Sequence, residues 1–442
     1  MAKEMKMRWM VSFGLLVLVC LLGLGNYEAV PGSTTAGPTA EAGDVAWMLT
    51  AAGLVLLMTP GLAFFYGGMV QYKNIVSTML QSFIALGVIS IFWVVCGFSL
   101  AFGESMGPEG YGFIGNPTTF FMMRGVGMET DMALSPTVPL ALFALFQLKF
   151  AIITPALITG GFAERIKFSS FLVFILLFCI FIYCPLAHST WHPNGFLRNW
   201  GVLDFAGGTV VHISAGFAAL AGAMYVGKRQ SWQQEHEPSN IPFVLLGTGM
   251  LWFGWFGFNA GRALAANSLA VSAFLNTNTA SAAAMLAWVF LDGVLGKKPS
   301  ASGACIGAVV GLVAITPAAG YVTVGQSMFI GLVASCVSNY AVRYKSKTTL
   351  DDTLDVFPCH GLGGIVGMVL TGVFAKDVGL MYGEGSTFVF HLIALVVVSI
   401  FTFFGSWMLY FLTDRVSPLR IGLEDEAIGL DLSQHGERAN NK

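Results

Sequence analysis

The sequence predicts an all-α polytopic membrane protein with eleven transmembrane helices. The chain of 442 residues is 55% hydrophobic and only 10% charged, whereas a soluble domain carries about 25% charged residues. Apolar segments near the roughly 20 residues that cross a bilayer as a helix follow one another along most of the chain. The 53 glycines favour close helix–helix contact, because a residue without Cβ lets two backbones approach.

The N-terminal segment has the pattern of a secretory signal peptide. Lys3, Lys6 and Arg8 precede the short apolar stretch Trp9–Gly25, and a polar stretch, Pro31–Pro38, follows. We expect a cleaved signal over about residues 1–30. An uncleaved extra helix is the alternative, and both place the mature N-terminus outside.

The eleven apolar segments predict one membrane domain over residues 44–413 rather than several soluble domains. They centre on residues 45–70, 80–103, 138–163, 169–187, 203–227, 241–260, 267–292, 301–317, 326–343, 356–375 and 388–413. With the N-terminus outside, the inside loops together with Arg415 and Arg420 after the last segment hold twelve Lys and Arg residues, and the outside loops hold four. The positive-inside rule therefore predicts an N-out, C-in topology with a cytoplasmic tail over 414–442. The net charge of −2 predicts no nucleic-acid partner.

Two histidines at matching positions indicate an inverted repeat. The stretch Asp204–His212 opens the fifth segment and the stretch Asp355–His360 opens the tenth. A glycine follows each histidine at the fourth position and a lysine at the sixteenth. Segments five and ten run in opposite directions, so we expect five helices related to five by inverted topology, with the eleventh added outside the pair.

Ionisable residues inside a membrane are costly, which makes His212 and His360 candidate functional residues. Two neutral imidazoles that face each other share one proton and offer a donor and an acceptor to a small polar solute. No third histidine or carboxylate has the spacing of a metal site, and the seven cysteines contain no CxxC pair. No metal or other cofactor is expected.

Three aromatic residues are further candidate functional residues. Phe146 precedes a glutamine, Trp191 falls on an expected outside loop, and Phe258 ends an aromatic run. Aromatic faces attract desolvated cations through the ring quadrupole. Lipid-belt or core packing is the alternative for each ring taken alone.

Four stretches resemble the Amt/Mep/Rh ammonium transporter family, nearest to its bacterial Amt branch: Thr59–Gly68, Asp204–His212, Gly254–Gly261 and Asp355–Gly361. The resemblance covers about residues 44–437. It implies a homotrimer in the bacterial inner membrane with one conduction path per subunit. It also implies that the tail takes part in regulation, often with a trimeric PII signal protein.

The resemblance implies a role for each candidate residue. Phe146 and Trp191 would recruit ammonium at the outer end, and Phe146 with Phe258 would gate the path. His212 and His360 would line it, and Asp204 would give structural and electrostatic support. The implied mechanism is deprotonation of ammonium near the gate, passage of ammonia past the histidines, and separate, electrogenic proton transfer.

Two positions depart from the family pattern. Arg262 stands where the family has a small hydroxyl residue that helps to coordinate the recruited cation, and Lys149 lies one turn inward from Phe146. Either cation would restrict conduction or favour sensing, unless both side chains point away into ion pairs or the vestibule.

Three other functions compete with transport. An ammonium sensor with low flux, signalling through the tail, is the main alternative. A channel for another small neutral solute, such as carbon dioxide or water, is disfavoured by the Phe146/Trp191 cation site. An intramembrane enzyme is not expected, because the sequence has no nucleophile–base motif.

Overall fold

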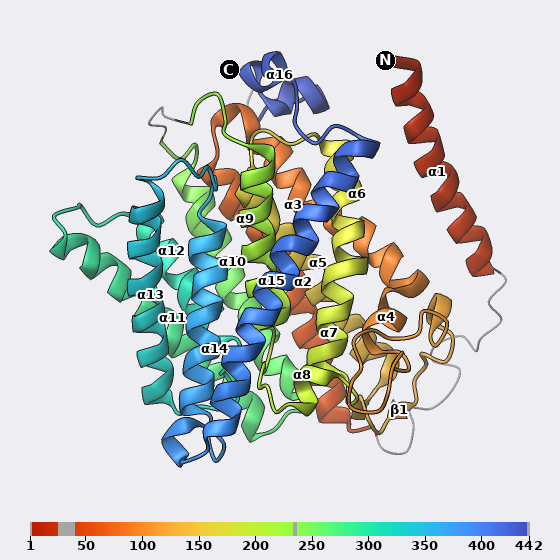
Figure 1. The fold of residues 1–442 in the computed structure, drawn as a ribbon, viewed down its shortest axis with the longest axis vertical. Helices are drawn as coiled ribbons and strands as arrows, with labels where there is room; N and C mark the ends of the chain where they lie inside the picture. Colours follow the sequence, from red (N-terminus) through yellow and green to blue (C-terminus); the bar gives the residue numbers. More distant parts are fainter. Residues whose placement is uncertain (1, 25–39, 233–236, 440–442) are drawn as a thin grey trace.

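The computed structural model describes residues 2–24, 40–232 and 237–439, which fold into a bundle of long helices (Figure 1). The continuous helices are α1 (Ala2–Leu24), α2 (Ala42–Met69), α5 (Leu140–Ile158), α10 (Ile241–Ala260), α11 (Ser268–Val294), α12 (Ala301–Ile315), α13 (Val324–Lys345) and α15 (Gly385–Val416). Two helices contain a π-helical turn, α3 (Ile75–Phe92) with η2 (Trp93–Gly97) and α4 (Phe98–Phe102), and α6 (Phe168–Phe178) with η5 (Cys179–Tyr183) and α7 (Cys184–Trp191). Two others begin with such a turn, η6 (Gly208–Ile213) with α9 (Ser214–Val226), and η8 (Phe357–Leu362) with α14 (Gly363–Phe374).

Each of the eleven predicted segments overlaps one of these helices. Among the described residues, nine helical stretches are long and apolar enough to cross a membrane. The other two predicted segments form α12, which has only 15 residues, and α13, which buries polar side chains such as Ser335 and Asn339. The prediction of a polytopic helical membrane protein is therefore confirmed, with nine spans supported by length and composition.

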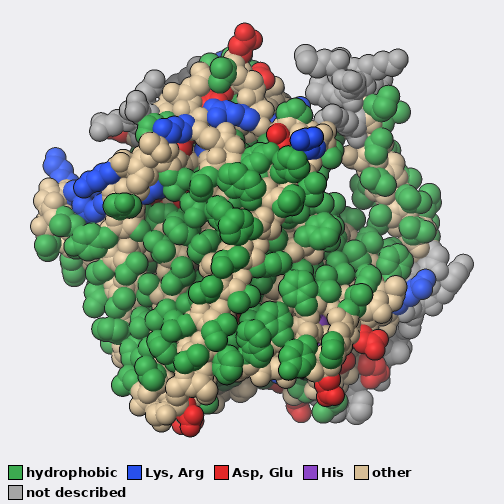
Figure 2. All heavy atoms as spheres, viewed as in Figure 1, with side chains coloured by type: hydrophobic (Ala, Val, Ile, Leu, Met, Phe, Trp, Pro, Cys, Tyr) green, Lys and Arg blue, Asp and Glu red, His purple; other side chains and the backbone are tan. Residues whose placement is uncertain are grey.

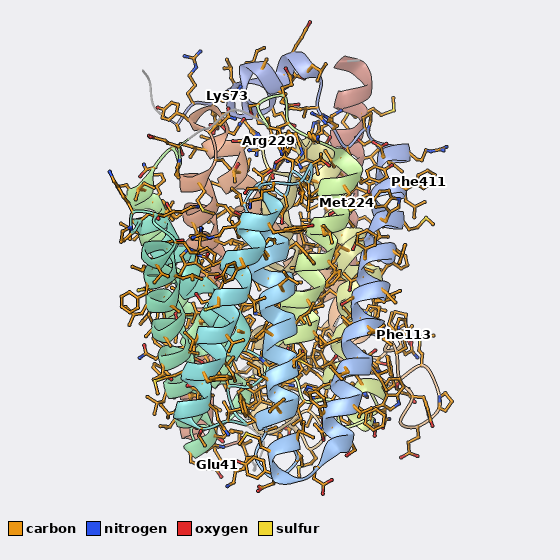
Figure 3. The ribbon with its side chains drawn as sticks, turned by 60° about the vertical axis from the view of Figure 1, so that its left-hand side comes forward. Glu41, Lys73, Phe113, Met224, Arg229 and Phe411 are labelled. Atoms are coloured by element: carbon orange, nitrogen blue, oxygen red, sulfur yellow. The ribbon has the colours of Figure 1, made fainter. Side chains whose placement is uncertain are left out.

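The bundle has two ends of different character. We call the tail face the end that carries α16 (Leu423–Ile428), and the loop face the opposite end, which carries α8 (Phe196–Asn199) and the segment 103–139. Lys73 and Arg229 lie near the tail face and Glu41 near the loop face (Figure 3). Figure 2 shows a broad hydrophobic surface between the two, with Lys and Arg gathered toward the tail face and acidic side chains at the loop face.

The segment 103–139 at the loop face contains a small antiparallel sheet of β1 (Thr130–Asp131) and β2 (Ser135–Pro139). Glu104, Glu109 and Glu129 are exposed on it. At the N-terminus, α1 stands apart from the bundle in the view of Figure 1. The predicted end of the signal peptide, near residue 30, lies outside the described residues.

Glycine allows the close helix contacts that the composition predicted. Helices α2 and α10 lie against each other, and a Cβ added at Gly257 would come within 2.7 Å of the backbone oxygen of Ala51. A Cβ at Gly247 would overlap the backbone of Phe65. Such backbone contacts cannot relax by a rotamer change, so these positions require glycine.

The tail folds back onto the tail face. The carboxylate of Asp431 accepts hydrogen bonds from the backbone amides of Val76 (3.0 Å) and Ser77 (2.8 Å), the free donors in the first turn of α3. Lys73 Nζ donates to the backbone oxygen of Ala427 at 2.7 Å. The tail therefore caps a helix of the bundle.

Candidate functional site

Two histidines from different helices meet inside the bundle. His212 lies on the turn η6 and His360 on the turn η8. Their Nδ1 atoms are 3.4 Å apart and their ring centroids 5.5 Å apart. Both side chains are buried. The structure thus brings together the two residues that the sequence repeat pairs.

The pair has a defined hydrogen-bonding capacity. A neutral imidazole has one N–H, so in an Nδ1···Nδ1 contact one ring donates and the other accepts. The donating ring then has a bare Nε2, and the accepting ring an Nε2–H. Nε2 of His212 is buried and has no hydrogen-bond partner among the described residues. Since a buried polar atom without a partner costs about 1–3 kcal/mol, a small polar solute beside it would be stabilised.

The glycines four residues after each histidine explain why the two rings meet. A Cβ added at Gly216 would overlap the backbone of Gly361, next to His360. A Cβ added at Gly364 would meet Ile213 at 2.9 Å and the Cβ of His212 at 3.4 Å. Each glycine therefore lies where its helix crosses the helix of the other histidine. The two helices have opposite directions, because α9 ends and η8 begins at the tail face, where Arg229 donates to Asp351.

Asp204 holds the start of the helix that carries His212. Its carboxylate accepts hydrogen bonds from the backbone amides of Gly207, Gly208 and Thr209 at 2.6–2.7 Å, from the hydroxyl of Thr209 at 2.5 Å, and from the amide of Val210 at 3.5 Å. These are the donors that a helix N-terminus leaves free. Asp204 therefore caps this helix, and its electrostatic role in conduction stays a prediction.

Asp352, which was not predicted, has the same role for His360. Its carboxylate accepts from the amides of Val356 (3.1 Å) and Phe357 (2.8 Å). Like Asp204, it stands eight residues before its histidine, and that equal spacing is the signal that could have found it. Asp355, with which the sequence stretch began, instead pairs with Lys345 at 2.6 Å.

The neighbouring residues Asp351 and Asp352, near the tail face, have pKa values that are shifted in opposite directions. Burial raises the pKa of Asp352 to about 6, and the nearby Lys345 opposes this rise. Burial also acts to raise the pKa of Asp351, but Arg165 and Arg229 overcome it and hold that pKa below its ordinary value. Lowering the pH therefore changes the contributions of Asp351 and Asp352 to stability in opposite directions.

A column of aromatic rings leads from the histidines toward the loop face. Trp255 lies 5.3 Å from His212 between ring centroids, and Phe258 lies 6.1 Å from it. Phe258 is stacked on Phe150 at 4.1 Å, and Phe150 meets Trp191 edge-on at 5.8 Å. The column thus joins Trp191 to the histidine pair through Phe150 and Phe258.

The structure corrects the gating pair predicted from the sequence. Phe150, one turn further along α5, stacks on Phe258, whereas Phe146 contacts Phe150 at 5.0 Å and has no ring contact with Phe258 or Trp191 among the described residues. Phe146 instead packs against Gly261. Phe150 was not predicted, because the resemblance assigned the gate to Phe146 and only the rotation of α5 within the bundle decides which of the two rings meets Phe258.

Trp191 is also placed differently from the prediction of an outside loop. It is the last residue of α7, and its side chain is buried. Its indole Nε1 donates to the backbone oxygen of Asp204 at 3.1 Å. Asp204 therefore has two roles. Its backbone oxygen positions the indole of Trp191, and its carboxylate positions the helix of His212.

The two unexpected cations lie in different places. The guanidinium carbon of Arg262 lies 5.2 Å from the ring centroid of Trp191, so this side chain points into the aromatic column. Lys149 is half-buried beside Phe150 and forms no ion pair or hydrogen bond in the described part of the chain. The alternative that both cations turn into ion pairs does not hold for Arg262 in the part of the chain that the structure describes, whereas a position in the vestibule stays a prediction.

A small cavity lies between the histidines and the tail face, on the side away from the aromatic column. His360 lines it together with Phe65, Tyr66 and Cys359. The phenol of Tyr66 donates to the backbone oxygen of Leu157 at 2.9 Å, which holds its ring in this wall. The histidine pair therefore lies between a sealed aromatic column and a cavity.

Comparison with known proteins shows the family of this chain. The family model described as Ammonium Transporter Family matches residues 46–440. The chain belongs to this ammonium transporter family. An ammonium transporter of Aquifex aeolicus is 44% identical over 91% of this chain and 94% of its own length, and one of Bacillus subtilis is 42% identical over 90% and 98%.

Solved structures of ammonium transporter relatives share the fold. Mep2 of Saccharomyces cerevisiae aligns with a TM-score of 0.82 at 32% identity, over 90% of this chain and 93% of that one. A structure described as a sensor Amt protein aligns with a TM-score of 0.80 at 29% identity, over 89% and 98%. The match of the family model extends through the docked tail.

Proposed function

We propose that this chain transports ammonium across a membrane along the column that ends at His212 and His360. The observation that carries the proposal is the buried Nε2 of His212, which has no partner among the described residues and lies where the aromatic column meets the second histidine. An ammonium ion would lose most of its hydration in such a bore, at a cost of several kcal/mol. Neutral ammonia loses far less and finds a donor and an acceptor at the histidine pair.

Deprotonation therefore acts as the selectivity filter. Ammonium is recruited near Trp191 and gives up its proton near the stacked rings of Phe150 and Phe258. Ammonia then passes the histidines into the cavity beside His360. The proton crosses separately, which makes transport electrogenic. Potassium, which has the same charge but no proton to lose, is rejected.

The wider assembly follows from the family resemblance. We propose eleven spans with the N-terminus outside and the C-terminus in the cytoplasm, a cleaved signal peptide, and a homotrimer in a bacterial inner membrane. The concentration of Lys and Arg toward the tail face supports this orientation. Labelling of single cysteines introduced at Lys228 and Glu109 in intact cells tests it, and only the one at Glu109 is expected to react.

The docked tail supports a regulatory role at the cytoplasmic face, where a PII-type protein is the proposed partner. The bonds from Asp431 to the first turn of α3 and from Lys73 to the tail are the contacts that a partner would have to break or reinforce. Asp431→Ala is expected to expose Arg420 to trypsin, since Arg420 pairs with Glu426 in the docked tail. An unchanged cleavage rate would argue against regulation by tail release.

Current recording on a solid-supported membrane tests the transport route. Proteoliposomes containing the wild type are expected to give an ammonium-dependent current that His212→Phe/His360→Phe abolishes. His391→Gln is the matched control, because His391 is also buried but hydrogen-bonds Met368 and Leu203 outside the column. An ammonium current that survives the double substitution would refute the assigned roles of the histidines.

An ammonium sensor with low flux is the second candidate. The observation that favours it is Arg262, whose guanidinium points into the column through which ammonium would enter. The likeness to a structure described as a sensor Amt protein is compatible with this function. A wild type that binds ammonium but gives no current would favour sensing.

A further inference from the structure

Arg262 follows directly after the helix that carries Phe258. Helix α10 ends at Ala260, the short helix η7 (Gly261–Ala263) continues it, and Leu264 ends the turn with a φ of 55°. The negative end of the α10 dipole therefore lies beside the guanidinium and favours a cation there. On the other side, the guanidinium carbon is 5.2 Å from the centroid of Trp191, within the range of a cation–π contact.

The guanidinium has few other partners. Its Nε is buried without a hydrogen bond, and the side chain forms no ion pair with a carboxylate in the described ranges. The carboxylate of Asp204, on the same side of the bundle, is already occupied by five donors from its own loop and helix. The ring of Trp191 therefore contributes to the stabilisation of this charge.

We propose that Arg262 is a tethered competitor that occupies the outer cation site of this chain and sets the ammonium concentration at which the path is used. This inference rests on the proposed function, because it concerns the same entrance. A guanidinium carries the charge of ammonium, but it does not lose its proton and cannot enter the bore. Ammonium must therefore displace it from Trp191 before recruitment.

The test compares ammonium currents of the wild type, Arg262→Ser and Arg262→Lys in proteoliposomes. Arg262→Ser is expected to lower the half-saturating ammonium concentration on the order of tenfold, since a competing cation–π contact is lost. Arg262→Lys keeps the charge and is expected to stay near the wild type. Arg415→Ser is the matched control, because Arg415 lies 4.7 Å over the ring of Phe411, on α15 and away from the column.

Free guanidinium provides a readout that a structural role would not change. Added guanidinium is expected to inhibit Arg262→Ser, whose site is empty, and to leave the wild type nearly unaffected. Equal inhibition of both proteins, or an unchanged half-saturating concentration in Arg262→Ser, overturns the proposal. Arg262→Gln serves as the second variant if the serine variant does not yield folded protein.

The same experiment separates failure of this inference from failure of the proposed function. A current in the wild type that Arg262→Ser does not change leaves transport standing and refutes the competitor. A current gained in Arg262→Ser that persists when both histidines are replaced refutes the histidine route and supports the competitor. A current present only in Arg262→Ser supports the competitor and assigns the wild type to sensing.

Discussion

Nδ1 of His360 lies 3.4 Å from Nδ1 of His212, across the crossing point of two helices that run in opposite directions. The contact depends on two glycines, each four residues after one histidine, and on two aspartates, each eight residues before one. The helix caps and the close packing of the two helices thus both hold this pair of rings in place. Each of these supports can be removed separately.

Replacement of Gly364 tests the crossing. Gly364→Val is expected to push apart the helices of His212 and His360 and to lower the ammonium current on the order of 100-fold, as a misplacement of about 1 Å does in a preorganised site. Gly325→Val is the control, because nothing lies within 4 Å of a Cβ added at Gly325. A full current in Gly364→Val would show that the distance between the two rings is not critical.

Replacement of Asp204 tests the cap. Asp204→Ala leaves the first amides of η6 without their acceptor and is expected to lower the free energy of unfolding by about 2 kcal/mol or more. Thermal unfolding in detergent measures this. The contact between Trp191 and the backbone oxygen of Asp204 should weaken as well, so tryptophan emission is expected to shift. A variant as stable as the wild type would contradict the capping role.

Asp352 and Asp351 predict opposite responses to pH. Because burial raises the pKa of Asp352 to about 6 from 3.8, its ionised form destabilises the fold at neutral pH, and this cost disappears as the pH falls from 6 toward 4. The shift corresponds to about 3 kcal/mol. The free energy of unfolding of Asp352→Asn, measured relative to that of the wild type, should therefore increase as the pH rises from 4.5 to 7.

Asp351→Asn is the matched control for this pH dependence. Arg165 and Arg229 hold the pKa of Asp351 below 3.8 against the effect of burial, so its contribution is fully present above pH 4 and is lost only at lower pH. The stability deficit of Asp351→Asn is therefore expected to stay constant from pH 5 to 7. Parallel pH profiles for the two variants would contradict the assignment.

The ring contacts predict which phenylalanine seals the path. Phe150→Ala removes the ring stacked on Phe258 and is expected to admit water and let potassium carry a measurable current. Phe146→Ala removes a ring that only packs behind Phe150 and is expected to keep the rejection of potassium. Potassium and ammonium currents of the two variants give the comparison. A leak in Phe146→Ala alone would restore the original prediction for Phe146.

The sequence by itself determined the class of protein, the position of its helices and the identity of its central residues. Low charge and repeated apolar segments leave few folds other than a helical membrane bundle. His212 and His360 were visible because a buried ionisable residue is conspicuous in an apolar chain. The motifs around them were long enough to indicate the family.

Only the tertiary structure decided which neighbours surround these histidines. The rotation of α5 places Phe150 rather than Phe146 against Phe258. The backbone turn at Asp355 leaves the cap to Asp352. The end of α10 turns Arg262 toward Trp191. Sequence spacing limits the face on which a side chain lies, but its final direction depends on helix rotation and packing across the whole bundle.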